Sequence, residues 1–207
     1  MSANTTLQGQ PASSGMDTDR RTWLLATTAM GAAAAGAVAV PFVNSFAPSE
    51  RAKAQGASVE VDISGLEPGG MMTVEWRGKP VWILRRTPEM LESLKEMSGL
   101  ADPDSRKNQQ PEYARNTERA IHPEYLVTIG ICTHLGCAPV TLPEGTSNPS
   151  VPADWNGGFF CPCHGSTFDY AGRVFKNKPA PTNLEVPPHK YLTDTRLLIG
   201  EDDSGTA

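Results

Sequence analysis

Cysteine and histidine are concentrated in two short segments of this 207-residue chain. The first box, CTHLGC, covers residues 132–137, and the second box, CPCHGS, covers residues 161–166. Together they contain all four cysteines and two of the four histidines. Thiolate sulfur and imidazole nitrogen are the ligands of zinc, copper and iron-sulfur centres. The two boxes therefore predict a site for a metal ion or a metal cluster.

Six candidate ligands are too many for one tetrahedral ion, which binds four. Each box can supply one cysteine and one histidine to a metal: Cys132 with His134, and Cys161 with His164. One further cysteine remains in each box, and these two, Cys137 and Cys163, could close a disulfide that ties the two loops together.

Three kinds of site compete for these residues. Structural zinc sites usually pair their ligands as C-x2-C and H-x3–5-H, whereas each box here mixes cysteine with histidine. A domain held only by disulfides would explain four cysteines but neither histidine. A two-iron, two-sulfide cluster with two cysteines on one iron and two histidines on the other uses every residue. The mixed boxes therefore favour an iron-sulfur cluster.

The segments around the boxes indicate a domain rich in β-strands. Apolar, β-branched runs at residues 58–63, 71–76 and 80–86 are bounded by the turn sequences EPGG and RGKP. Residues 124–131, EYLVTIGI, predict a buried strand that leads directly to the first box. Thr87 as N-cap, Pro88 at the first helical position and Gly99 beyond the end predict one helix. Residues 101–123 are polar and predict a long surface segment.

The N-terminal part has the composition of a membrane anchor. No charged residue occurs between Arg21 and Glu50, and residues 23–46 are long enough to span a bilayer as a helix. Pro41 is expected to bend or end this helix near its outer face. The adjacent Arg20 and Arg21 keep the preceding end in the cytoplasm and stand where a twin-arginine export signal places them. A cleaved signal, with AKA at residues 52–54 as the cleavage site, is the alternative.

These features divide the chain into five predicted parts. They are a cytoplasmic segment with the twin-arginine motif (1–21), a transmembrane helix (22–46), a flexible tether (47–57), the main domain (58–200, with a cluster-binding subdomain at about 125–182) and a disordered tail (201–207). His122 and His189, outside the boxes, are expected on the surface, and Trp76 and Trp82 in the core. The net charge of −5 argues against binding to nucleic acid.

The boxes, the anchor, RRTPEM at residues 85–90 and KPAPTNLEVP at residues 178–187 resemble the bacterial Rieske iron-sulfur subunit of the cytochrome bc1 complex, ubiquinol-cytochrome c reductase. The resemblance covers nearly everything after residue 19. It implies a mainly β fold, with a Rieske-type antiparallel β-sandwich head, a small cluster-binding subdomain and one N-terminal transmembrane helix. It also implies one [2Fe-2S] cluster as cofactor.

The same resemblance implies a role for individual residues. Cys132 and Cys161 would bind the inner iron, His134 and His164 the outer iron, and Cys137 would pair with Cys163. His164 would also face the quinol and accept its proton. Three more residues complete the implied site: Ser166 bonds a bridging sulfide, Leu135 docks on cytochrome b, and Pro179 belongs to a proline loop over the cluster.

The implied function is electron transfer in the respiratory chain. The cluster would accept one electron from ubiquinol at the cytochrome b site and pass it to cytochrome c1, within a dimeric complex of the bacterial inner membrane. The chain would cross that membrane once and expose its C-terminal head to the periplasm. The alternative is the small Rieske subunit of another exported oxidoreductase such as arsenite oxidase, which a cleaved N-terminus would favour.

Overall fold

The computed structural model describes residues 15–50, 56–146, 148, 150–151 and 155–204. The chain divides into two compact units, residues 1–51 and 52–207. Several predicted features lie outside the described residues: most of the cytoplasmic segment (1–14), the middle of the tether with the alternative cleavage site (51–55), and the last tail residues (205–207).

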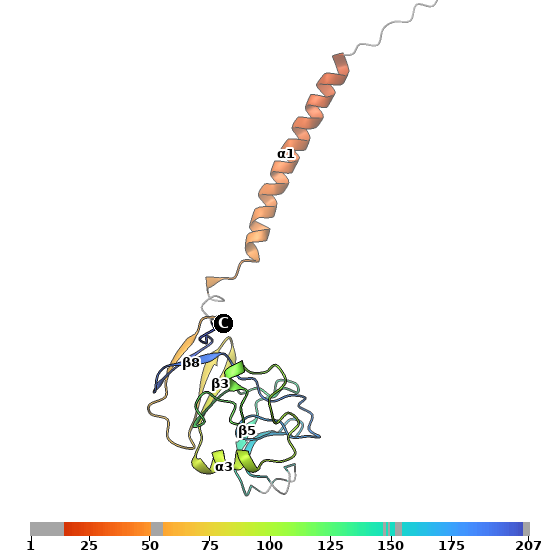
Figure 1. Ribbon diagram of the computed structural model, residues 1–207. Helices are drawn as coiled ribbons and strands as arrows, with labels where there is room; N and C mark the ends of the chain where they lie inside the picture. Colours follow the sequence, from red (N-terminus) through yellow and green to blue (C-terminus); the bar gives the residue numbers. More distant parts are fainter. Residues whose placement is uncertain (1–14, 51–55, 147, 149, 152–154, 205–207) are drawn as a thin grey trace, which may run out of the picture. The chain divides into compact units, whose positions relative to one another are not determined.

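The first unit contains the helix α1, Gly15–Ser45 (Figure 1). Its Thr18–Ser45 part has a mean hydropathy of 1.6 and is long and apolar enough to cross a membrane, as predicted. The helix continues through Pro41 to Ser45, so Pro41 does not end it. A proline removes one backbone hydrogen bond to the preceding turn, and the residues after it still bond within the helix.

In its described residues, the second unit, the head, contains three antiparallel sheets of three strands each. The base sheet has the order β1 (Val59–Asp62), β9 (Arg196–Ile199), β8 (His189–Thr193). The central sheet has the order β2 (Met71–Trp76), β3 (Lys79–Arg85), β4 (Tyr125–Ile129). The cluster sheet has the order β5 (Val140–Leu142), β6 (Gly158–Cys161), β7 (Ser166–Phe168).

The central sheet is covered on both faces, as the packing of alternate side chains along β3 shows. Val81 and Ile83 join a core with residues of β1 and β9, whereas Trp82 and Leu84 join a second core with the cluster sheet. Successive side chains of a strand point to opposite faces, so a strand buried on both faces reads as one apolar run. This arrangement confirms the predicted mainly β fold and explains the sequence PVWILRR.

The helix α3, Pro88–Glu96, begins where the sequence predicts it. Thr87 is the N-cap, and its side-chain oxygen accepts a hydrogen bond of 3.3 Å from the backbone N–H of Met90. Such a cap satisfies one of the free N–H groups of the first helical turn. Leu94 is the residue that this helix buries against the cluster-side core.

Residues 101–123 lie largely at the surface, as predicted, but several of their polar side chains are buried, which the prediction did not include. Ser105 and Arg119 are fully buried, and only a single turn of 3-10 helix, η1 (Glu112–Ala114), forms in this segment. Arg119 donates hydrogen bonds to the carbonyl oxygens of Ala171 (3.1 Å) and Leu184 (2.7 Å). A buried polar group is tolerated when it has such partners, and these partners come from distant parts of the chain.

The start of the predicted disordered tail also lies against the head. Lys190 pairs with Glu201 at 2.8 Å, and the Asp202 residue is 7% exposed.

The predicted surface position is correct for His122 and wrong for His189, which is 1% exposed. Trp76 and Trp82 are buried as predicted.

His189 is held by its surroundings as a neutral imidazole. Its ring meets that of Tyr113 edge-on, with centroids 5.5 Å apart, and its backbone N–H donates to the Tyr113 hydroxyl at 2.8 Å. The ring Nδ1 lies 2.9 Å from the carbonyl oxygen of Pro187. Burial lowers the pKa of His189 to about 4, because the charged form would lose its hydration.

The pKa of His189 predicts a loss of stability in acid. Between pH 6.5 and 4 the unfolded chain binds a proton that the folded chain does not, so the free energy of unfolding falls as the pH falls through this range. At ~1.36 kcal/mol per pH unit the loss is about 3 kcal/mol. Urea unfolding of the wild type and of His189→Asn, at pH 7 and pH 4.5, should show a smaller acid effect in the variant. Equal acid effects would contradict the assignment.

Candidate functional site

The two boxes form two turns of the same kind at the end of the head that carries the cluster sheet. The first box lies between β4 and β5, and the second connects β6 to β7. In each turn the carbonyl oxygen of the first cysteine accepts a hydrogen bond from a glycine N–H: Gly136 to Cys132 at 3.0 Å, and Gly165 to Cys161 at 2.9 Å. Both glycines have a positive φ, 83° and 75°, which other residues rarely adopt. The turn therefore explains why each box contains its glycine.

The predicted ligands form two pairs across these turns, one of cysteines and one of histidines. Cys132 and Cys161 are free thiols, each 2% exposed. The rings of His134 and His164 face each other at right angles, with centroids 4.7 Å apart. Each of these two pairs takes one residue from each box, and their joint ligation of a metal remains a prediction.

The imidazole of His134 suits a metal ligand. Its Nδ1 is buried and has no hydrogen-bond partner in the part of the chain that the structure describes. An unpaired buried nitrogen costs free energy, and a bound metal would supply the missing partner. The donor set of two thiols and two imidazoles is the one that a Rieske-type [2Fe-2S] cluster needs. The residues therefore fit that group.

The Cys132 thiol is held in its neutral form when no metal is bound. Burial raises the pKa of Cys132, and hydrogen bonds from the His134 backbone and the Ser166 side chain act in the opposite direction. Metal ions bind the deprotonated sulfur and displace the proton. The hydrogen bonds that favour the thiolate would therefore also favour a metal-bound sulfur.

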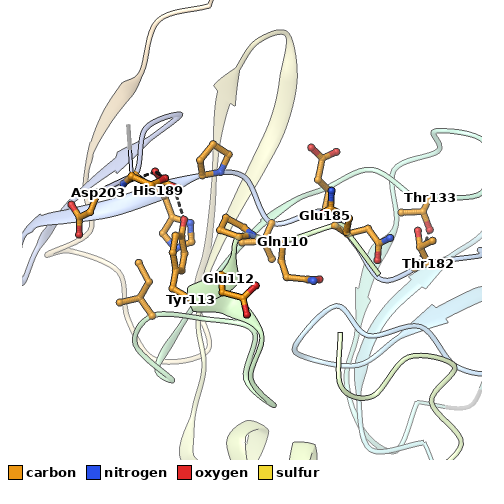
Figure 2. Close-up of a pocket in the computed structure, with 16 residues that line it drawn as sticks. Gln110, Glu112, Tyr113, Thr133, Thr182, Glu185, His189 and Asp203 are labelled. Atoms are coloured by element: carbon orange, nitrogen blue, oxygen red, sulfur yellow. Dashed lines mark hydrogen bonds between the residues drawn. The ribbon is translucent and has the colours of Figure 1, made fainter. Parts of the chain in front are cut away.

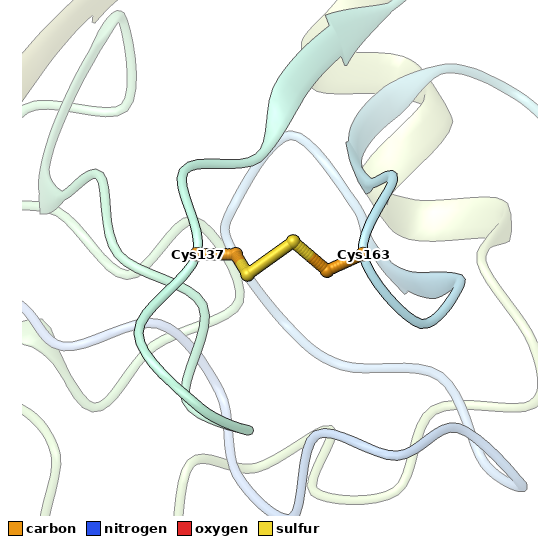
Figure 3. Close-up of a disulfide and its surroundings, with 2 residues drawn as sticks. All are labelled: Cys137 and Cys163. Atoms are coloured by element: carbon orange, nitrogen blue, oxygen red, sulfur yellow. A yellow bond between two sulfur atoms is a disulfide. The ribbon is translucent and has the colours of Figure 1, made fainter.

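A disulfide joins the two turns beside these ligands. Cys137 of the first box bonds Cys163 of the second, with their Cα atoms 6.7 Å apart (Figure 3). The first turn is closed further by the hydrogen bond from the Cys132 N–H to the Cys137 carbonyl oxygen, at 2.8 Å. The predicted disulfide is thus confirmed, and it fixes the distance between the boxes.

The segment that follows residue 178 ties both boxes together from a third side. The N–H of Ala180 donates to the Ser166 hydroxyl oxygen at 3.0 Å, and the Thr133 hydroxyl donates to the Thr182 carbonyl oxygen at 2.7 Å. Lys107 reaches the Pro181 carbonyl oxygen at 2.7 Å. Pro179 itself is exposed next to the buried Ala180. The sequence analysis did not identify Thr133 or Lys107. The position of Thr133 between Cys132 and His134 could have indicated its role, whereas no sequence feature indicated that of Lys107.

The second box also has a rigid support on its far side. The strand β7 runs into a turn in which Asp169 and Arg173 form a buried ion pair of 2.6 Å. The Asp169 carboxylate accepts two more hydrogen bonds, from the N–H groups of Ala171 and Arg173. A buried pair needs such additional bonds to offset the loss of hydration.

Two side chains of the boxes are turned to the solvent. Leu135 is 72% exposed, and His164 is exposed as well. A single exposed leucine is common on protein surfaces, so the docking role of Leu135 remains a prediction from the resemblance.

A groove of about 1120 Å³ lies next to this site (Figure 2). His189, Tyr113 and Asp203 lie at one end of it, and Thr133 and Thr182 lie at the other. None of the four predicted ligands lines the groove. The predicted metal site therefore lies outside this hollow.

Comparison with known proteins identifies two matching families. The Rieske [2Fe-2S] domain matches residues 58–188, and the family described as "Ubiquitinol-cytochrome C reductase Fe-S subunit TAT signal" matches residues 11–49. The ubiquinol-cytochrome c reductase iron-sulfur subunit of Allochromatium vinosum is 58% identical over 184 residues, which cover 88% of each chain. The subunit of the same name from Bradyrhizobium diazoefficiens is 39% identical over 190 residues, 91% of this chain and 98% of its own.

Proposed function

The chain belongs to the Rieske iron-sulfur subunits of ubiquinol-cytochrome c reductase, and from this membership we propose how its two boxes hold and use the [2Fe-2S] cluster of the family. The proposed ligands are the two free thiols and the two facing imidazoles: Cys132, Cys161, His134 and His164. Membership in this family sets aside the alternative of an arsenite oxidase subunit.

The observation that carries the proposal is the position of His164. When bound, the cluster would carry one electron from ubiquinol at cytochrome b to cytochrome c1. His164 is exposed, so its ring can meet a quinol that approaches from outside the head. The ring nitrogen that does not bind iron can accept the quinol proton. His134 is only partly exposed, so we assign the substrate contact to His164.

Leu135 is proposed to dock on cytochrome b. Its side chain is 72% exposed and stands in the same turn as the ligand His134. Burial of a leucine on docking contributes ~1.5 to 3 kcal/mol, which is roughly 10- to 150-fold in affinity. Leu135→Asp should therefore slow ubiquinol oxidation by the isolated complex by a factor in this range, while the EPR signal of the cluster keeps its intensity.

Leu192 provides the matched control for this experiment. It is an exposed leucine, 46% exposed, on β8 of the base sheet. Leu192→Asp makes the same chemical change away from the boxes and should leave the rate unchanged. An unchanged rate in Leu135→Asp, or an equal fall in both variants, would overturn the docking role and with it the proposed approach of the quinol.

Ser166 is proposed to tune the potential of the site. Its hydroxyl oxygen accepts a bond from the Ala180 N–H, which leaves its proton free to donate to sulfur. A hydrogen bond to sulfur draws off negative charge and favours the reduced state. One such bond contributes ~0.5 to 1.5 kcal/mol, or roughly 20 to 65 mV for one electron. Redox titration should find the potential of Ser166→Ala lower by that amount. An unchanged potential with an intact cluster would exclude this role.

The helix α1 is proposed to anchor the head in the bacterial inner membrane with the head in the periplasm. Arg20 and Arg21 precede its apolar part, which favours a cytoplasmic N-terminus. The twin-arginine signal family covers this region. The tether of residues 47–57 would let the head move between cytochrome b and cytochrome c1, and Pro179 would cover the cluster from the proline loop. We propose that the chain works in this way within a dimeric complex.

A further inference from the structure

A third sulfur lies beside the disulfide of the two boxes. The Sγ atoms of Cys137, Cys161 and Cys163 all lie within 4.8 Å of one another. Cys137 and Cys163 are already bonded, so this group is not a second metal site, and Cys161 is the free thiol among them. A thiol that close to a disulfide can attack it by thiol–disulfide exchange. We propose that in the cluster-free chain Cys161 exchanges into this disulfide, bonding Cys137 and releasing Cys163.

The direction of the exchange follows from exposure. The sulfur that leaves a disulfide departs as a thiolate, and a thiolate is stabilised by water. Cys163 is exposed, whereas Cys137 is half-buried and Cys161 is buried. Attack on the Cys137 sulfur therefore releases the cysteine whose thiolate is best hydrated. Cys132, the other free thiol, does not belong to this group of three sulfurs.

The exchange needs no oxidant and no reductant. Cys161 gives its proton to the solvent, its sulfur bonds the Cys137 sulfur as the bond between Cys137 and Cys163 breaks, and Cys163 takes up a proton. One disulfide and two thiols exist before and after the step. The free thiols change from Cys132 and Cys161 to Cys132 and Cys163.

The consequence is a cluster-free form that lacks one of its four proposed ligands. This inference rests on the proposed ligation, in which Cys161 binds iron. A bound cluster occupies the Cys161 sulfur and so preserves the disulfide between Cys137 and Cys163. Without it, the exchange removes one of the two cysteine ligands. The proposal thus predicts that a chain whose disulfide forms before the cluster is bound loses this ligand to the exchange.

Two ligand variants test the proposal as a matched pair. Cys132→Ser and Cys161→Ser each lack one proposed ligand, so neither should hold a cluster, but only Cys132→Ser keeps the attacking thiol. The full-length proteins are purified without reductant, their free thiols are alkylated, and the peptides are mapped by mass spectrometry. Cys132→Ser should show alkylated Cys163 and a disulfide between Cys137 and Cys161. Cys161→Ser should show the disulfide between Cys137 and Cys163, with Cys132 alkylated.

The wild-type protein gives an independent test that does not depend on how the variants fold. Its cluster is removed with an iron chelator under anaerobic conditions without reductant, and samples are alkylated over time. The Cys163 adduct should appear as the cluster absorption falls. Retention of the disulfide between Cys137 and Cys163, in both the chelated protein and Cys132→Ser, would overturn the proposal. A cluster retained by Cys132→Ser would instead contradict the ligand assignment, and the chelated wild type would still decide the exchange.

Discussion

Alanine at any one of the four ligand positions is expected to leave the chain without its cluster. Alanine has no side-chain atom that can bind iron. In a cluster held by only three side chains, one iron is accessible to solvent and the cluster is lost. Chains purified from membranes should contain neither iron nor acid-labile sulfide, whereas the wild type should contain both in equal amounts. The variants are Cys132→Ala, His134→Ala, Cys161→Ala and His164→Ala.

His122→Ala is the matched control for the histidine variants. His122 is exposed and lies outside both boxes, and its ring contacts that of Tyr191 with centroids 4.3 Å apart. Its replacement should leave the iron and sulfide content at the wild-type value. A ligand variant that kept the full content would show that the residue it lacks does not hold the cluster.

Removal of the disulfide should destabilise the head without removing a ligand. The two cysteines are 26 residues apart in the chain, and closing a loop of that length contributes about 3.5 kcal/mol to the free energy of unfolding. The double variant Cys137→Ser/Cys163→Ser should show this loss in urea unfolding. It should also lose its visible absorption faster than the wild type in the presence of an iron chelator, because the two turns are no longer tied together.

The double variant with alanine in place of serine is the control for the added hydroxyl groups. It should lose the same amount of stability, since the missing bond is common to both variants. Wild-type stability and wild-type cluster lifetime in both double variants would show that the hydrogen bonds to Ala180 and Thr182 hold the turns without the disulfide.

Features set by neighbouring residues could be predicted from the sequence. The cap at Thr87 and the turn glycines of the boxes act over a few residues. The helix α3 and the pairing of one cysteine with one histidine in each box could therefore be predicted from the sequence. The buried strand before Cys132 could also be predicted, because a short apolar run rich in β-branched residues favours a strand over a helix. The resemblance then supplied the cofactor and the roles that spacing alone left open.

Features set by distant residues could not be predicted. Arg119 is buried because carbonyl groups more than 50 residues further along the chain accept its hydrogen bonds. His189 is buried against Tyr113, 76 residues earlier in the chain. Both residues are predicted to be exposed, because the sequence does not reveal the distant partners that allow a polar side chain to be buried. The bond from Thr133 to Thr182 escaped prediction for the same reason.

Pulsed EPR of the reduced full-length protein tests the ligation most directly. The protein is prepared once with natural histidine and once with ¹⁵N-labelled histidine, so that every nitrogen coupling from an imidazole changes between the two spectra. Ligation by His134 and His164 predicts couplings from two histidine nitrogens to the cluster spin, and both should shift with the label. A cluster signal without histidine couplings, or bound zinc without any cluster signal, would contradict the account.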